Sequence, residues 1–240
     1  MRIFLAGAGG AIGRRLTPLL RKAGHDVIGT TRTPEKAAAL RALGADPVVL
    51  DVFDAAALTR AVQAASPQVV IHQLTDLPSA PGTPGYQAGL ERNARLRIDG
   101  TRNLVAAAQA AGVKRLIAQS IAFVYAPGEG ARLESDPLDL AASGVRQRTI
   151  EGVAALELAT LTMPEGIVLR YGFLYGLGTW FETQARAKPA LHVDAAAHAA
   201  LLALTKGQPG IYNIAEDDGA VSSDKAKRDF GFDAAFRTAV

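Results

Sequence analysis

The chain has 240 residues, with 26 Lys and Arg against 23 Asp and Glu, a formal net charge of +3 and no cysteine. The missing cysteines exclude thiol nucleophiles, disulfides and cysteine-ligated metals, and the four histidines show no metal-ligand spacing. Charges of both signs are well mixed, so the composition gives no support to nucleic-acid binding. No apolar run reaches membrane-spanning length and the N-terminus does not resemble a signal peptide, so we expect a soluble, cytoplasmic protein without membrane contact.

The N-terminal stretch predicts a buried strand, a glycine turn and the start of a helix. Residues 3–6 are apolar and four glycines follow within the next seven positions. A phosphate approaches the backbone closely only where there is no Cβ, and the N-terminus of a helix presents N–H groups and a positive dipole end. We expect Gly7 to form the turn, Gly10 to admit a pyrophosphate and Gly13 to let the helix pack on the strand. The predicted phosphate-binding residues are Gly7, Gly9, Gly10, Ala11, Ile12 and Gly13.

The spacing of these glycines is Gly7-x-x-Gly10-x-x-Gly13, which differs from the common GxGxxG fingerprint because position 12 is Ile. It resembles the short-chain dehydrogenase/reductase superfamily, in particular its extended branch of NAD(P)-dependent epimerases and dehydratases. The alternative is a chance cluster in a chain with 24 glycines. A position between a strand and a helix is the context that the motif requires, and it favours dinucleotide binding.

Apolar runs alternate with helical segments in the next part of the chain. We expect strands over residues 26–30, 47–51 and 68–72, with helices over 34–43 and 55–64 between them. Repeated strand–helix units predict a Rossmann-like α/β fold, a doubly wound parallel sheet whose ligands bind beyond the carboxyl ends of the strands. We divide the chain into a Rossmann domain (1–170) and a small, shortened substrate lobe (171–240) whose last strand and helices complete the same fold.

The end of the second strand bears on the choice of cofactor. Enzymes that select NAD place an acidic residue there, whereas this chain has Thr31 and Arg32, which suit a 2′-phosphate. We therefore favour NADP(H), with NAD(H) as the alternative and a solvated loop charge as the other interpretation of Arg32. Asp51 and Val52 resemble the adenine-contacting residues of the family, although Asp51 also fits a helix cap. Leu74 begins a loop over residues 74–90, placed to overhang the cofactor.

Two long helices follow in the pattern, over residues 90–111 and 145–161. Residues 97–104 (RIDGTRNL) resemble the NxxGTxNL segment of the family, whose first Asn is Arg97 here. In relatives this helix pairs with the next long one in a dimeric four-helix bundle. The resemblance thus implies a homodimer, with packing inside one chain as the alternative.

The acid–base group of the family is missing. The resemblance implies a tyrosine with a lysine four residues later, yet no YxxxK occurs anywhere in the chain. Aligned on Glu157, the two positions hold Thr149 and Val153. Ser120, at the end of a predicted strand over 113–120, and Tyr125 are the remaining catalytic candidates, resembling the SSxxVYG segment. In the structural alternative, the Ser120 hydroxyl only bonds backbone groups at the end of the strand, and the Tyr125 ring only packs in the wall of the cleft.

The last third resembles the end of the epimerase fold. The backbone after Arg170 lies against the nicotinamide in relatives, so the cofactor candidates here are Tyr171, Gly172 and Phe173. We expect Trp180 either to line the substrate pocket or to pack in the hydrophobic core. We expect Asp194 to cap a helix and His192 to be structural, followed by a strand over 210–215 and a helix within 221–230. The segments after Trp180 and after residue 215 are shorter than in nucleotide-sugar enzymes, which suggests a small substrate.

Two functions remain open at this stage. The first is an atypical NADP(H)-dependent oxidoreductase or epimerase-like enzyme acting on a small carbonyl or sugar-derived substrate, with protonation by water or Tyr125. The second is a binding protein that senses the redox state of NADP(H) without turnover and changes its contacts with a partner. The missing YxxxK favours the second, and the aromatic residues near the expected cleft favour the first.

Overall fold

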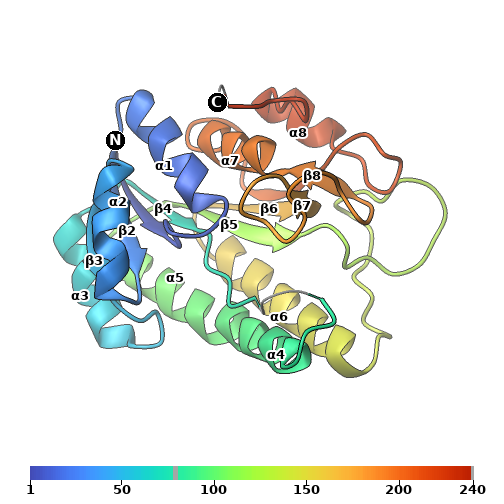
Figure 1. Ribbon diagram of the computed structural model, residues 1–240, viewed down its shortest axis with the longest axis horizontal. Helices are drawn as coiled ribbons and strands as arrows, with labels where there is room; N and C mark the ends of the chain where they lie inside the picture. The colour runs from blue at the N-terminus through green and yellow to red at the C-terminus, as the bar shows by residue number, and fades with distance from the viewer. Residues whose placement is uncertain (78–80, 239–240) are drawn as a thin grey trace.

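The computed structural model describes residues 1–77 and 81–238, and its centre is a seven-stranded sheet (Figure 1). The strand order is β3-β2-β1-β4-β5-β6-β9, and every neighbouring pair is parallel. The strands are β1 (Arg2–Ala6), β2 (Asp26–Thr31), β3 (Asp46–Val49), β4 (Val69–His72), β5 (Arg115–Ile121), β6 (Glu165–Tyr171) and β9 (Gly210–Ile214). The predicted doubly wound α/β fold is confirmed.

Helices cover both faces of the sheet (Figure 1). They are α1 (Gly13–Lys22), α2 (Ala37–Ala42), α3 (Ala55–Ala65), α4 (Tyr86–Arg95), α5 (Thr101–Ala110), α6 (Gly144–Leu161), α7 (Val193–Leu202) and α8 (Asp224–Phe230), with a 3₁₀ turn η1 (Pro34–Lys36) and a π-helical turn η2 (Leu96–Gly100). Alternate residues of each strand point to opposite faces. Ile3 and Leu5 accordingly join the core under α1, α7 and α8, while Phe4 and Ala6 join the core under α3, α5 and α6.

The C-terminal segment joins the same sheet through β9, which pairs with β6. It also contains a two-stranded parallel sheet of β7 (Phe173–Tyr175) and β8 (Ala190–His192) that the sequence pattern did not predict. Strands of three residues are too short to show an alternation, which explains the omission. The division of the chain at residue 170 stays a prediction.

Several predicted boundaries need correction. The helix expected over 90–111 is three segments, because η2 interrupts it between α4 and α5, and α4 begins inside the predicted loop. Residues 78–80 of that loop lie outside the described residues. The N-cap predicted at Asp194 is wrong: the cap of α7 is His192, whose Nδ1 accepts the Asp194 N–H at 3.2 Å. The Asp194 carboxylate instead binds Arg15 and Thr238.

In the described part of the chain, no helix is both long enough and apolar enough to cross a membrane.

Candidate functional site

The turn between β1 and α1 depends on two glycines. Gly7 has a φ of +93°, and a Cβ built on it would lie 2.5 Å from the carbonyl oxygen of Gln73. A Cβ on Gly13 would collide with the backbone of Gly7 and Ala8. Because these neighbours are backbone atoms that cannot move aside, both positions require glycine. The turn therefore holds the first helix against the end of β1, as the fingerprint spacing predicts.

The other two glycines of the turn face open space. A Cβ on Gly9 would have nothing within 4 Å, and one on Gly10 would meet only the Gly7 carbonyl, at 3.4 Å. Both residues line a cavity of about 210 Å³ beyond the carboxyl ends of β1 and β2. Such a hollow in front of a helix N-terminus is a cradle for a phosphate. The residues present thus fit a dinucleotide.

Most of the predicted cofactor residues meet at this cavity. The predicted residues that line it are Gly7, Gly9, Gly10, Thr31, Arg32, Asp51, Val52 and Leu74. The further lining residues, which the sequence did not single out, are Ala6, Thr30, Lys36, Leu50, Phe53, Leu58, Thr75 and Leu96. Five of these are chain neighbours of predicted residues, namely Ala6, Thr30, Leu50, Phe53 and Thr75, whereas tertiary packing brings Lys36, Leu58 and Leu96 to the cavity. The predicted residues Ala11, Ile12 and Gly13 do not line the cavity; they lead into α1, whose N-cap is Ile12.

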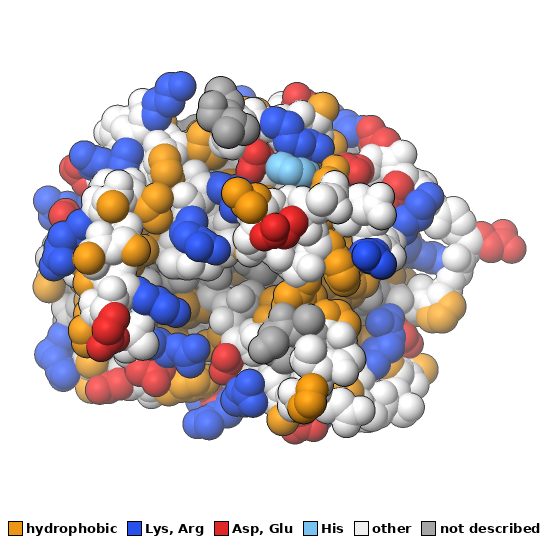
Figure 2. Space-filling model, viewed as in Figure 1, with side chains coloured by type: hydrophobic (Ala, Val, Ile, Leu, Met, Phe, Trp, Pro, Cys, Tyr) orange, Lys and Arg blue, Asp and Glu red, His pale blue; other side chains and the backbone are white. Residues whose placement is uncertain are grey.

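The end of the cavity beside β2 carries two cations. The Arg32 side chain is 60% exposed and its guanidinium lies 3.7 Å from the Asp76 carboxylate, while Lys36 ends the 3₁₀ turn η1 four residues later. The face in Figure 2 shows Lys and Arg side chains around this part of the molecule, in the region of α2 and β2. The Asp51 carboxylate accepts the Phe53 N–H at 3.0 Å, and the cap of α3 is Asp54. Asp51 is therefore free of the helix-capping role and remains a candidate adenine contact.

The three residues after Arg170 lie apart from that cavity. The Tyr171 ring is buried in the core, and its hydroxyl accepts a hydrogen bond from Gln73 Nε2 at 3.4 Å. The Gly172 N–H donates to Ile214, and a Cβ on Gly172 would lie 2.7 Å from the Pro189 carbonyl oxygen. Phe173 stacks on Phe123 with ring centroids 3.8 Å apart. Their predicted contact with the nicotinamide stays a prediction.

Helix α6 offers no substitute for the missing dyad. The Thr149 hydroxyl donates to the Val145 carbonyl of its own helix at 3.1 Å. Val153 is fully buried in an apolar cluster with Ile121, Val124 and Ile150. Neither position carries an acid or a cation.

Ser120 and Tyr125 belong to one buried network. The Ser120 hydroxyl donates to Glu157 Oε1 at 2.7 Å, and Glu157 also accepts two bonds from Arg170. The Arg170 guanidinium lies 4.9 Å from the centre of the Tyr125 ring, whose hydroxyl donates to Asn213 Oδ1 at 2.5 Å. Burial raises the pKa of the Tyr125 hydroxyl, with Arg170 opposing the shift. Both catalytic candidates thus have their hydroxyls engaged inside the protein.

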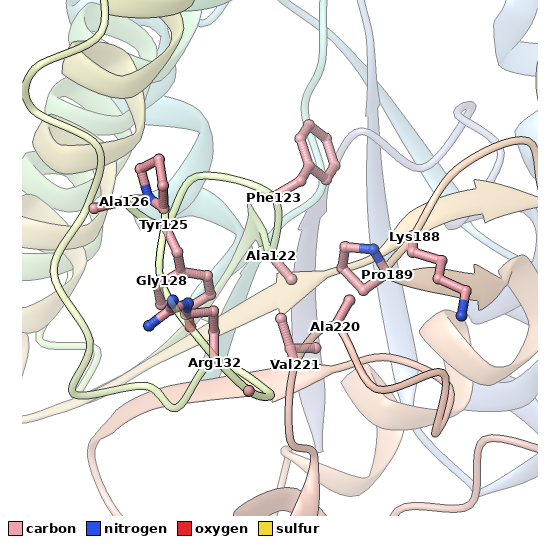
Figure 3. A pocket seen from close by; sticks show the side chains of 12 residues that line it. Ala122, Phe123, Tyr125, Ala126, Gly128, Arg132, Lys188, Pro189, Ala220 and Val221 are labelled. Carbon is pink, nitrogen blue, oxygen red and sulfur yellow. The ribbon is translucent and has the colours of Figure 1, made fainter.

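A second cavity of about 340 Å³ lies beside Tyr125. Figure 3 shows Tyr125, Gly128 and Arg132 on one side of it, with Pro189, Ala220 and Val221 on the other. The Lys188 ammonium also borders this cavity but donates to the Asp218 carbonyl at 2.8 Å. Trp180 lies elsewhere, 37% exposed, with its ring centroid 6.1 Å from that of Tyr86. The sequence had indicated only Tyr125 for this pocket.

A parallel sheet in the order 3-2-1-4-5-6, with a glycine turn after its first strand, defines a dinucleotide-binding protein of the Rossmann type. The family whose sequence model is described as NAD(P)H-binding matches residues 7–149. This chain belongs to that NAD(P)H-binding family.

A reductase is similar to this chain in sequence, and several nucleotide-sugar enzymes are similar to it in fold. The 3-diazoavenalumate denitrifying reductase of a Streptomyces species is 40% identical over 92% of this chain and 77% of that protein. UDP-glucose 4-epimerase from Bifidobacterium longum, solved with NAD⁺ and UDP, superposes with a TM-score of 0.77 at 16% identity, over 98% of this chain and 94% of that one. UDP-glucose 4-epimerase from Thermotoga maritima, solved with UDP-glucose, gives a TM-score of 0.75 at 17% identity, over 99% and 94%. These similarities confirm the predicted relationship to the extended short-chain dehydrogenase/reductase fold.

Proposed function

We propose that this protein is an NADPH-dependent reductase of a small molecule that works without a tyrosine–lysine dyad. The observation that carries the proposal is the cavity at the glycine turn, which has room for a pyrophosphate at Gly9 and Gly10 and two cations at its β2 end. The reductase from Streptomyces, similar over nearly the whole chain, supports reduction as the reaction.

The preference for NADPH rests on Arg32 and Lys36. Both line the β2 end of the cavity, where the residues directly after the strand, Arg32 and Thr33, include no carboxylate to accept a ribose 2′-hydroxyl. A 2′-phosphate would be bound by charge-assisted hydrogen bonds from these two side chains. The Thr31 hydroxyl is held by the Thr33 N–H at 3.2 Å, so it presents a fixed oxygen beside them.

The protein's own residues bind the cofactor and orient the substrate. When bound, the reduced nicotinamide supplies a hydride. Because the Tyr125 hydroxyl is bonded to Asn213 and its pKa is raised by burial, Tyr125 is a weak proton donor. A substrate that takes its proton from water, or that needs none in the hydride step, fits this site. A diazo compound such as the one named for the Streptomyces reductase is one such class, and a small carbonyl or sugar-derived compound is the other.

The test is a titration of the purified protein with NADPH and NADH, followed by the fluorescence of the reduced nicotinamide. We expect NADPH to bind more tightly, and Arg32→Ala and Lys36→Ala each to weaken NADPH by about tenfold while leaving NADH unchanged. Arg41→Ala is the matched control, because Arg41 is exposed on α2 away from the cavity. Binding should then be followed by NADPH oxidation with carbonyl and aryl diazonium compounds. Equal affinity for the two cofactors in every variant would refute the NADPH preference.

A non-catalytic NADP(H) sensor is the second candidate. It is favoured by the hydroxyls of Ser120 and Tyr125, which are both engaged in buried hydrogen bonds. This function predicts a protein partner whose affinity differs between the NADPH-bound and NADP⁺-bound forms. NADPH oxidation with any of the screened compounds, at a rate abolished by Gly9→Ala, would decide for the reductase.

We also propose a homodimer in the cytoplasm. Leu158 and Leu161 on α6 are 72% and 41% exposed, on one of the two helices that the family resemblance assigns to a dimer interface. Light scattering of the wild type and of Leu158→Glu tests the dimer, since a charge on this face should give the monomer. A wild-type monomer at micromolar concentration would contradict it.

A further inference from the structure

One nearly buried arginine has no partner. Arg97 lies on η2, the π-helical turn between α4 and α5, and is 6% exposed. Within residues 1–77 and 81–238 it takes part in no hydrogen bond and no ion pair. Buried guanidinium groups are ordinarily paired because an unpaired buried charge is costly. Single π-helical turns recur at functional sites, where they aim a side chain that a regular helix would place elsewhere.

The carboxylate that acts on the charge of Arg97 already accepts three hydrogen bonds from other residues. Glu157 accepts two hydrogen bonds from Arg170, at 2.8 and 2.6 Å, and a third from Ser120 at 2.7 Å. Burial lowers the pKa of Arg97 to about 10, with Glu157 opposing the shift, so the group is still charged at neutral pH. Arg170 and Arg97 thus both lie near the Glu157 carboxylate, and only Arg170 is hydrogen-bonded to it. The uncompensated charge is that of Arg97.

Arg97 lies near the carboxyl end of β4. Its charge helps to lower the pKa of His72, the last residue of β4, which is bonded to Thr101 one turn further along the helix. The preceding residue, Leu96, lines the dinucleotide cavity. Among the described residues, the side-chain atoms that are both buried and unpaired are Gln73 Oε1, Arg132 Nη2 and His198 Nδ1. The Arg97 nitrogens are unpaired but are not among them, so they are not fully enclosed by the core. The Arg97 guanidinium therefore keeps some contact with solvent, although the residue as a whole is only 6% exposed.

We propose that Arg97 binds an anionic oxygen group of the substrate, a carboxylate above all, near the carboxyl ends of β4 and β5. That the ligand is a substrate rests on the proposed function, whereas the binding of an anion rests on the surroundings of Arg97 alone. A carboxylate satisfies the planar guanidinium with two parallel hydrogen bonds and removes the uncompensated charge. It thereby fixes the substrate next to the cofactor, which a site without an acid–base dyad needs for orientation.

Stability separates this role from a structural one. If Arg97 waits for a ligand, Arg97→Met removes an unpaired cation from the free protein, and the melting temperature should stay the same or rise. If Arg97 instead served as a structural partner of Glu157, the same change would lower the melting temperature by several degrees. Arg97→Lys keeps the positive charge but loses the planar, two-pronged donor geometry of the guanidinium. We expect this variant to fold in either case.

Binding of small carboxylates gives the direct test, measured by calorimetry or ligand-observed NMR on the free protein and on the NADP⁺-loaded protein. The probes are acetate and benzoate, each compared with its neutral amide. We expect the wild type to bind at least one acid more tightly than its amide, Arg97→Met to lose that preference by about tenfold or more, and Arg97→Lys to keep part of it. Arg102→Met, an exposed arginine of α5 paired with Asp99, is the matched control and should behave as the wild type.

The outcomes separate the inference from the proposed function. If the wild type does not discriminate acids from amides, or if Arg97→Met discriminates as the wild type does, the inference is wrong even when NADPH binds and is oxidised. If NADPH does not bind, the proposed function is wrong, and the acid preference of the free protein still tests Arg97. Loss of NADPH affinity in Arg97→Met, without loss of acid preference, would assign Arg97 to the cofactor phosphates and overturn the inference.

Discussion

Glu157 on α6 and Arg170 on β6 form a two-pronged buried ion pair, with Oε2 of the glutamate 2.6 Å from Nη2 of the arginine. The pair lies at the carboxyl ends of β5 and β6, where the Ser120 hydroxyl donates a further hydrogen bond to Glu157. The ion pair links the central sheet to α6, the helix in which Thr149 and Val153 stand in place of the tyrosine and lysine of the dyad.

Breaking this pair from one side should destabilise the protein strongly. Glu157→Gln leaves the Arg170 charge buried and uncompensated, so we expect the free energy of unfolding to fall by about 3–5 kcal/mol. The double variant Glu157→Leu/Arg170→Met should lose less, because both charges leave together. Urea denaturation measures both. Glu151→Gln is the control on the same helix, since Glu151 pairs with Arg148 at the surface, and an equal loss in the control would contradict the prediction.

Two glycine variants should separate folding from cofactor binding. Gly9→Ala places a methyl group in open space in the cavity, so we expect unchanged stability and a loss of NADPH affinity of tenfold or more. Gly13→Ala places the methyl group against the Gly7 and Ala8 backbone, so we expect a clear drop in melting temperature as well. Thermal unfolding and nicotinamide fluorescence give the two readouts. Wild-type NADPH affinity in Gly9→Ala would place the pyrophosphate elsewhere.

His72 should make the fold sensitive to acid. Burial lowers the pKa of this imidazole from 6.5 to about 4, so the unfolded chain binds the proton in the pH window between these values and the folded chain does not. The free energy of unfolding should therefore fall by about 3 kcal/mol between pH 6.5 and pH 4. His72→Gln should show a flatter pH dependence over this window. The same slope in His72→Gln as in the wild type would mean that other groups cause the acid loss.

Tyr125→Phe should affect stability more than chemistry. The substitution leaves the buried Asn213 Oδ1 without the donor that lies 2.5 Å away, which should cost about 1–2 kcal/mol in urea denaturation. We expect NADPH oxidation to stay within about twofold of the wild type, because a hydroxyl whose pKa is raised by burial is a poor acid. A tenfold loss of kcat with unchanged KM would instead make Tyr125 the proton donor.

Local patterns in the sequence were enough to predict the elements that build the cofactor cavity. Gly7 needs a positive φ and Gly13 a close approach, and both demands concern neighbouring backbone that a short motif encodes. The apolar runs of β1, β4 and β5 are buried on both faces and therefore stand out without any knowledge of their partners. The order of strands and helices followed from these runs, because parallel strands require crossover helices.

Contacts between distant segments could not be predicted in this way. The cap of α7 was assigned to Asp194 from its residue type, yet the carboxylate binds Arg15, 179 positions away, and leaves the cap to His192. The same holds for Tyr125 and Asn213, which are 88 residues apart. A polar side chain takes its partner from whatever the fold brings near it, and sequence spacing does not report that distance.

The sequence by itself determined the Rossmann order of elements, the glycine cradle and the absence of a YxxxK dyad, since each is a property of neighbouring residues. Only the tertiary structure decided that Ser120 and Tyr125 have their hydroxyls engaged inside the protein, and that Arg97 is nearly buried without a hydrogen-bond or ion-pair partner among residues 1–77 and 81–238. The physical reason is that burial and pairing depend on all the segments packed around a side chain, and these meet only when the sheet is assembled.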